Sequence, residues 1–399
     1  TSGRGFINGL AGQRFAVRNS GATVVVAQNV GAGNVKVASE TTNQAFSACV
    51  MLAAVCSLFM VCLGRPLIAA LFPGTEALVT ANAQTYLYYS AGSYPFLAAF
   101  SAAAGILRAG RNTRGPMIAS VVSNLVNVGV GALLIFGLRL GVAGAGVALV
   151  CARMSGALLL VWMLRSNVKD VRLTRFTLRF RREILVPVLK IGIPAGIENC
   201  MFQIGKLSVS SLTSTPGTAA IAANAVAGNI SSFLNVPASA VGIGALTVVG
   251  QCLGAGEKVQ AKRYSRLLLL TAYAGDWLMN LSGLFFLNKL ALSWFNLSPD
   301  AYGMALELMV WFNVVSLILW PASFTLPNIL RAAGDAAFTM TVSVISMWVF
   351  RVAFCYLMVL KFHCGLLFIW MGMFLDWAMR SLFFCVRFVR GRWMEQKVI

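Results

Sequence analysis

Hydrophobic residues gather in long runs that short polar segments separate. About 20 apolar residues in helical conformation span the hydrocarbon core of a bilayer, and runs near that length follow one another along the chain. They cover residues 10–30, 43–64, 82–106, 115–138, 141–164, 184–212, 225–250, 265–287, 303–328, 338–360 and 364–387. The pattern predicts an all-α polytopic membrane protein with about eleven transmembrane helices. Arg14 and Arg18 make the first run the weakest.

The two halves of the chain repeat each other. Residues 21–33 read GATVVVAQNVGAG and residues 244–256 read GALTVVGQCLGAG, an offset of 223 positions. ILRA at residues 106–109 recurs at residues 329–332 with the same offset. Six runs fit within one offset, and an even number of spans gives both halves the same orientation. We therefore expect two pseudo-symmetric bundles of six helices.

The repeat also predicts the domain boundaries. The 184–212 run opens the second half, and its partner at an offset of 223 falls before residue 1. We therefore expect an N-terminal lobe at 1–164 that lacks the first of twelve helices, and a C-terminal lobe at 184–399. Between them, residues 165–183 form the only long polar stretch, which we interpret as a basic linker and hinge.

The amino-acid composition excludes two classes of protein. The chain has 399 residues, of which 58% are hydrophobic and 11% charged. An ordinary soluble domain has about 25% charged residues, and disorder requires low hydrophobicity, so both classes are excluded. The net charge of +20 would suit a nucleic-acid partner or basic cytoplasmic loops.

The position of the basic residues decides between these two interpretations. Loops on one side of the predicted membrane hold twenty, including the seven of the linker and Arg331, and loops on the other side hold four: Arg65, Arg139, Lys289 and Lys361. This asymmetry predicts a multi-pass protein of the plasma (inner) membrane with its linker and C-terminus in the cytoplasm. Because no continuous basic groove with interleaved aromatics appears, we expect no nucleic-acid partner.

The sequence motifs do not support an enzymatic function. The chain has no phosphate-binding loop of the G-x-x-x-x-G-K-[ST] type, and its one histidine, His363, follows a predicted helix. The nine cysteines lie mostly in apolar runs and are interpreted as small buried hydrophobes. We expect no catalytic residues, no metal site and no cofactor. Gly31-Ala32-Gly33 and Gly254-Ala255-Gly256 are interpreted as helix stops.

Polar residues at membrane depth are the functional candidates, because burying them is costly. Glu198 follows Pro194 by four residues in the seventh helix of the expected twelve, together with Asn199 and Gln203. A carboxyl in an apolar cavity can take up a proton near neutral pH and release it when a cation arrives, which an antiporter requires. Alternatively, Glu198 forms an ion pair with Lys206 or Lys190.

Other polar residues favour structural roles. Asp376 precedes Arg380 by four residues, a spacing that favours an ion pair on one helix face, with Arg351 as a second partner. The alternative for Asp376 is a place in the ion-coupling or substrate cavity, together with Glu198. Asp276, in YAGDWLMN, is a further candidate for either a structural or a functional role. Gln28 and Gln251 close the two repeated helices, where they are expected to brace the backbone.

The repeated GATVVVAQNVGAG and GALTVVGQCLGAG segments, the two ILRA segments, LGVAGAGVALV and LDWAMR resemble the MATE family over essentially the whole chain. GIPAGIENCMF is similar to bacterial members. The resemblance implies two six-helix lobes around a V-shaped cavity, and export of cationic amphipathic drugs driven by Na⁺ or H⁺. Glu198 lies on the helix where other members hold a coupling carboxylate, at a shorter offset from the proline. Asp276 matches no family motif.

These observations predict a monomeric secondary antiporter that moves small cationic organic substrates across the lipid bilayer by alternating access of its two lobes. Two alternatives stay open. A lipid-linked oligosaccharide flippase would need intramembrane cations such as Arg14, Arg18 and Lys206 converging on a cavity. A chain without the first helix could also be an inactive truncated membrane protein or a scaffold.

Overall fold

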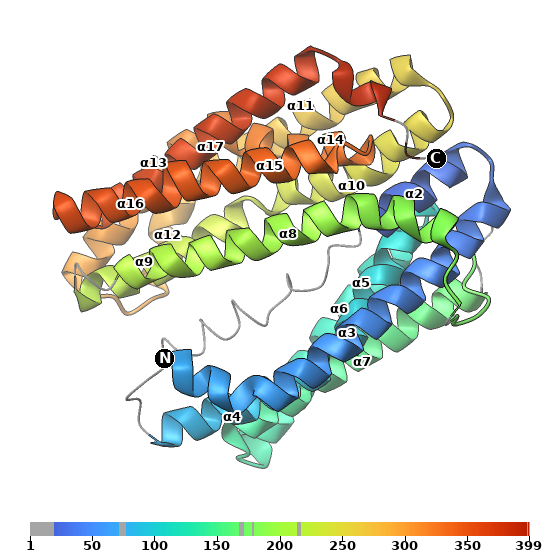
Figure 1. The fold of residues 1–399 in the computed structure, drawn as a ribbon. Helices are drawn as coiled ribbons and strands as arrows, with labels where there is room; N and C mark the ends of the chain where they lie inside the picture. Colours follow the sequence, from blue (N-terminus) through green and yellow to red (C-terminus); the bar gives the residue numbers. More distant parts are fainter. Residues whose placement is uncertain are drawn as a thin grey trace. The chain divides into compact units, whose positions relative to one another are not determined.

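The computed structural model describes residues 20–71, 77–166, 171–177, 179–213, 217–396 and 398 (Figure 1). Across this part of the chain, every regular element is helical. Eight of these helices are long and apolar enough to cross a membrane, and a ninth span forms if one bent pair counts as one. The predicted all-α polytopic fold is therefore confirmed. Arg14, Arg18 and the start of the 10–30 run lie outside the described residues.

The chain divides into two compact units between Gly196 and Ile197, inside helix α8 (Arg182–Leu212). The first unit holds α2 (Ser20–Gly31), α3 (Val35–Leu71), α4 (Ala77–Gly92), α5 (Tyr94–Ala109), α6 (Arg114–Ala132), the π-helical turn η1 (Leu133–Gly137), α7 (Gly141–Ser166) and the start of α8. The division lies beyond the linker at 165–183, and the lobe boundaries drawn from the repeat stay a prediction.

In the first unit, small residues bring helices close together. Helix α7 packs against α4, α5 and α6. Ala102, Ala103 and Ala104 of α5 are almost fully buried, and small side chains of this kind let transmembrane backbones approach closely.

The second unit holds the rest of α8 and the elements that follow it. These are α9 (Thr218–Leu234), α10 (Val236–Gly254), α11 (Lys258–Ser282), η2 (Gly283–Leu287), α12 (Asn288–Ser293), α13 (Pro299–Trp320), η3 (Pro321–Thr325), α14 (Leu326–Ala332), α15 (Ala336–Ser346), η4 (Met347–Ala353), α16 (Phe354–Tyr356), η5 (Leu357–Lys361), α17 (Leu366–Val389) and η6 (Arg392–Glu395). Helix α17, red in Figure 1, packs against α13 and α15, and the apolar core of the unit lies among these helices.

The helix boundaries repeat with the offset that the sequence predicts. Helices α2 and α10 end 223 positions apart, at Gly31 and Gly254, and each is followed by a glycine with positive φ, Gly33 at 76° and Gly256 at 77°. Helices α3 and α11 begin 223 positions apart as well. A non-glycine side chain is strained at such φ values, so the predicted helix stops are confirmed.

Two predicted runs are each divided in the structure. The 82–106 run comprises α4 and α5, which bend by 43° next to Ser93. The 225–250 run comprises the end of α9 and most of α10, which meet at Asn235. A proline follows each break, Pro95 and Pro237, at the first or second position of the next helix. Such a proline removes a backbone donor and favours a new helix start.

Polar side chains of α3 bind the segment that follows α7. Asn43 accepts a hydrogen bond from the Thr174 backbone N at 3.0 Å and donates one to Thr174 Oγ1 at 2.8 Å. Gln44 Oε1 accepts one from the Arg181 backbone N at 2.9 Å. The described part of the polar stretch is therefore attached to the first unit.

Candidate functional site

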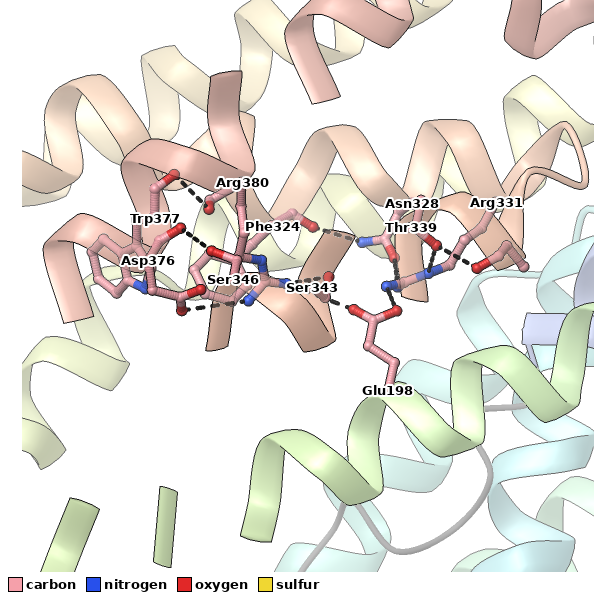
Figure 2. A network of polar contacts seen from close by, with 12 residues as sticks. Glu198, Phe324, Asn328, Arg331, Thr339, Ser343, Ser346, Asp376, Trp377 and Arg380 are labelled. Atoms are coloured by element: carbon pink, nitrogen blue, oxygen red, sulfur yellow. Dashed lines mark hydrogen bonds and ion pairs between the residues drawn. The ribbon is translucent and has the colours of Figure 1, made fainter. Parts of the chain in front are cut away.

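Glu198 forms the centre of a buried polar network in the second unit. It lies on α8 four residues after Pro194, and the helix continues from Arg182 to Leu212 with Pro187 and Pro194 inside it. Glu198 is 7% exposed. Its Oε2 accepts a hydrogen bond from Arg331 Nη2 at 2.5 Å, and its Oε1 lies 3.6 Å from Arg380 Nη2 (Figure 2). One carboxylate is thus shared by two guanidinium groups.

Neighbouring side chains hold Arg331 in place. It lies in the last turn of α14, where Nη1 donates to Asn328 Oδ1 at 3.1 Å and Nε donates to Thr339 Oγ1 at 3.2 Å. Only 5% of the residue is exposed. Our assignment of Arg331 to a loop is therefore wrong, because the residue lies in a helix and its side chain binds Glu198 inside the unit. The repeated ILRA segment was the signal that could have identified it.

Asp376 and Arg380 form the predicted i, i+4 pair on α17, with 3.9 Å between Oδ2 and Nη1. Arg380 Nη2 also donates to Ser343 Oγ at 3.0 Å, and its guanidinium lies 4.9 Å from the centre of the Phe324 ring. Asp376 is fully buried, and neither carboxylate oxygen has a hydrogen-bond partner among the described residues. Its long contact with Arg380 is a weaker pairing than that of Glu198.

Arg351 adds a third buried cation. It lies in η4, is 8% exposed, and approaches one Phe202 ring together with Arg380, both at 5.8 Å from the ring centre. An aromatic face attracts a cation by about 0.5–2 kcal/mol. Three arginines and the carboxylates of Glu198 and Asp376 leave this network with one excess positive charge.

The other polar candidates on α8 lie outside the set of residues labelled in the network of Figure 2. Asn199 and Gln203 are half-buried, and Lys206 is exposed. The ion pair of Glu198 is present, but its partners are arginines rather than Lys206 or Lys190. The coupling roles of Glu198, Asn199, Gln203 and Asp376 stay predictions.

Gln28 and Gln251 occupy equivalent places one turn before the ends of α2 and α10. Gln28 is buried and Gln251 is half-buried. Their backbone carbonyls accept from Ala32 N and Ala255 N at 2.9 and 3.0 Å, which closes the last turn of each helix. A bracing role for the two side chains stays a prediction.

Asp276 lies in a second buried polar region with different partners. It is fully buried on α11, and Ser316 Oγ of α13 donates to its Oδ2 at 3.4 Å. The Asn235 amide, oriented to satisfy its neighbours, donates to Oδ1 at 3.2 Å and accepts from Trp320 Nε1 at 2.7 Å. No Lys or Arg forms an ion pair with Asp276 in the described part of the chain. The aspartate therefore has only neutral partners.

Three buried asparagines extend this second region, and sequence analysis missed them. Asn280 and Asn313 are fully buried, and Asn288 is 2% exposed. Hydrophobicity alone gave no signal, because each asparagine lies in or beside an apolar run. Spacing could have identified Asn280, since it follows Asp276 by four residues and therefore lies on the same face of the helix.

Comparison with known proteins places this architecture among transporters. The sequence model of the MatE family matches residues 13–133 and 194–357. The probable multidrug resistance protein NorM of Thermotoga maritima is 28% identical over 397 residues, which cover 95% of this chain and 82% of that protein. The probable multidrug resistance protein YoeA of Bacillus subtilis is 24% identical over 88% of this chain and 77% of its own.

Solved structures share the fold. A MOP superfamily transporter from Pyrococcus furiosus, described as having a binding pocket of reverse polarity, aligns with a TM-score of 0.84 at 18% identity, over 99% of this chain and 87% of its own. A MATE structure in complex with MaL6 gives a TM-score of 0.84 at 19% identity, over 98% of this chain and 87% of its own. At these identities the likeness concerns the fold alone.

Proposed function

This chain belongs to the MatE family of membrane transporters, and from that premise we propose that it is a secondary active multidrug efflux antiporter. It exports cationic amphipathic drugs or metabolites in exchange for Na⁺ or H⁺, by alternating access of two lobes. We place it in the inner membrane as a monomer, with the 165–183 linker and the C-terminus in the cytoplasm. The multidrug resistance proteins to which it is similar support the substrate class.

The shared pairing of Glu198 with two arginines is the observation that carries this proposal. Glu198 follows the division between the two units by two residues, and its partners lie on α14 and α17. Protonating Glu198 removes the one charge that holds Arg331 and Arg380 together, and breaking a buried pair costs about 3–5 kcal/mol. An energy of this size is large enough to shift an equilibrium between two conformations.

The same network suggests how ion and substrate exclude each other. With Glu198 ionised, α8 is tied to α14 and α17 within the second unit. With Glu198 neutral, Arg331 and Arg380 repel each other and must find other partners, among which Asp376 already lies 3.9 Å from Arg380. An antiporter requires two such mutually exclusive arrangements, so that ion and substrate bind in alternation.

Transport in proteoliposomes tests the proposal. We expect a fluorescent organic cation to move against its concentration gradient when a Na⁺ or proton gradient is imposed, and to stop moving when the gradient is collapsed with an ionophore. A transport rate that is the same with and without either gradient would contradict antiport. Full gradient-driven transport by Glu198→Gln would remove Glu198 from the mechanism. Glu307→Gln, which changes an exposed carboxyl on α13, is the matched control.

A second function is favoured by the excess positive charge of the network. Guanidinium groups bind phosphate oxygens in bidentate fashion, so Arg331, Arg351 and Arg380 suit a lipid-linked oligosaccharide with a pyrophosphate. The predicted contribution of Arg14 and Arg18 lies outside the described residues. Translocation of a fluorescent lipid pyrophosphate by the reconstituted protein, without movement of the organic cation, would favour the flippase over the antiporter.

A further inference from the structure

The polar region around Asp276 is separate from the Glu198 network. Asp276 and Asn280 lie on α11, Asn313 and Ser316 lie on α13, and the two helices pack against each other. Asp276 contacts Ser316, and Gly283, which comes later in the chain, lies beside Asn313, which comes earlier than Ser316. The two segments therefore run antiparallel. Asn280 therefore lies between these two contacts.

Asp276 has no cationic partner on the elements that pack against α11. Helices α9 and α10 and the turn η3, which all pack against α11, contain no Asp, Glu, Lys or Arg. Helix α13 carries only Asp300 and Glu307, which lie more than two turns before Ser316. The nearby Tyr273 uses its hydroxyl to donate to the Ile318 carbonyl at 2.9 Å. An ionised Asp276 thus lacks a cationic side chain on these packed elements, and an uncompensated buried charge is strongly destabilising.

Several buried amide atoms in this region have no hydrogen-bond partner among the described residues. Asn280 Nδ2 donates to the Asp276 backbone carbonyl at 2.9 Å, while Asn280 Oδ1 has no partner among the described residues. Both polar atoms of Asn313 and both of Asn288 are buried without partners in the same part of the chain. Buried polar groups are nearly always hydrogen-bonded, so this concentration of unpaired amides requires an explanation.

The amides of Asn313 and Asn288 lie beside Gly283, which follows α11 directly and has no side chain. A Cβ at Gly283 would lie 2.7 Å from Asn313 Nδ2 and 3.2 Å from Asn288 Oδ1. Gly283 begins the π-helical turn η2, and η3 follows α13. Such turns interrupt the regular backbone ladder and occur often at functional sites. The bare backbone of Gly283 leaves the space in which these amide groups lie.

We propose that Asp276, Asn280, Asn313 and Ser316 bind a small monovalent cation, Na⁺, inside the second unit. Carboxylate, amide and hydroxyl oxygens are the ligands that hard cations prefer. One carboxylate neutralises one monovalent ion, whereas a divalent ion would leave a buried net charge. The proposal deepens the proposed function, because it assigns a coupling-ion site, but it is tested by binding without transport and can therefore fail separately.

The test measures Na⁺ binding to the purified full chain in detergent. We expect the unfolding temperature of the wild type to rise when NaCl replaces choline chloride at equal ionic strength, and calorimetry to give saturable Na⁺ binding. Asp276→Asn removes the charge but keeps the shape, and it should abolish both signals. Glu307→Gln, which changes an exposed carboxyl on the adjacent helix, should keep both signals.

Either of two results would overturn the site: a wild type whose stability and heat of binding do not respond to Na⁺, or an Asp276→Asn variant that binds Na⁺ as the wild type does. If Asp276→Asn fails to fold, Asn280→Ala decides on the same assays. Loss of one ligand oxygen should weaken Na⁺ binding by about tenfold or more, and unchanged affinity would contradict the proposal.

Discussion

The second unit buries two carboxylates in opposite electrostatic settings. Glu198 is shared by Arg331 at 2.5 Å and Arg380 at 3.6 Å. Asp276 is equally buried, yet its side-chain partners are the hydroxyl of Ser316 and the amide of Asn235. Burial alone therefore does not define a role. An ionised Glu198 ties α8 to α14 and α17 until its pairing with the arginines is broken, whereas Asp276, with neutral partners, needs a proton or an external cation.

Loss of the Glu198 carboxylate should destabilise the protein much more than loss of the Asp276 carboxylate. Glu198→Leu leaves Arg331 and Arg380 buried beside each other without their shared counter-charge, so the free energy of unfolding should fall by about 3–5 kcal/mol. Equilibrium unfolding of the detergent-solubilised protein measures this. Glu307→Gln, at an exposed position, should change stability by less than about 0.5 kcal/mol. Equal effects of the two variants would contradict the pairing.

Double-mutant cycles compare the strength of the Glu198–Arg331 pair with that of the Asp376–Arg380 pair. We expect a coupling energy of about 1.5–3 kcal/mol between Glu198 and Arg331, because a hydrogen bond to a charged group is worth that much. Asp376 and Arg380, 3.9 Å apart, should couple by less than about 1 kcal/mol. In the two cycles, Glu198 is replaced by glutamine, Asp376 by asparagine and each arginine by glutamine. A larger coupling at Asp376 than at Glu198 would reverse the predicted order of the two pairs.

The packing around Asp276 can be disturbed without changing its charge. Gly283→Ala places a Cβ 2.7 Å from Asn313 Nδ2, and overpacking of this kind costs about 1–3 kcal/mol. Gly303→Ala is the control, because a Cβ there meets no atom within 4 Å and alanine favours the helix by up to about 1 kcal/mol. The unfolding temperatures of the two variants should therefore shift in opposite directions.

Loss of the Asp276 carboxylate, which has only neutral partners, should change the free energy of unfolding much less than loss of Glu198. In sodium-free buffer, Asp276→Asn should change the free energy of unfolding by less than about 1 kcal/mol, because no arginine loses a partner and a neutral amide is easier to bury than a carboxylate. A destabilisation as large as that of Glu198→Leu would show that Asp276 has a cationic partner after all.

The sequence alone predicted the fold well and the sites only in part. The offset of 223 residues identified the repeat because each half must cross the same bilayer with the same helices, and the ends of α2 and α10 lie 223 positions apart accordingly. The pairing of Asp376 with Arg380 followed from helical spacing, since both lie on α17.

What sequence analysis missed depends on contacts between distant segments. Arg331 looked like a loop residue because it ends an apolar run, yet Glu198, 133 positions earlier, binds it inside the unit. Asn313 was overlooked because one amide hardly changes the hydropathy of a long helix, and only the packing of η2 against α13 shows that it is buried beside Gly283. Such pairings between helices cannot be deduced from periodicity within one helix.

The sodium dependence of transport decides whether the acid with neutral partners is the one that couples to the ion. Proteoliposomes containing the wild type, Asp276→Asn or Glu307→Gln are loaded with a fluorescent organic cation and given an inward Na⁺ gradient. We predict that the gradient drives efflux by the wild type and by Glu307→Gln, and that Asp276→Asn loses this response. Full Na⁺-driven efflux by Asp276→Asn would contradict the assignment of the coupling ion to the polar region of α11 and α13.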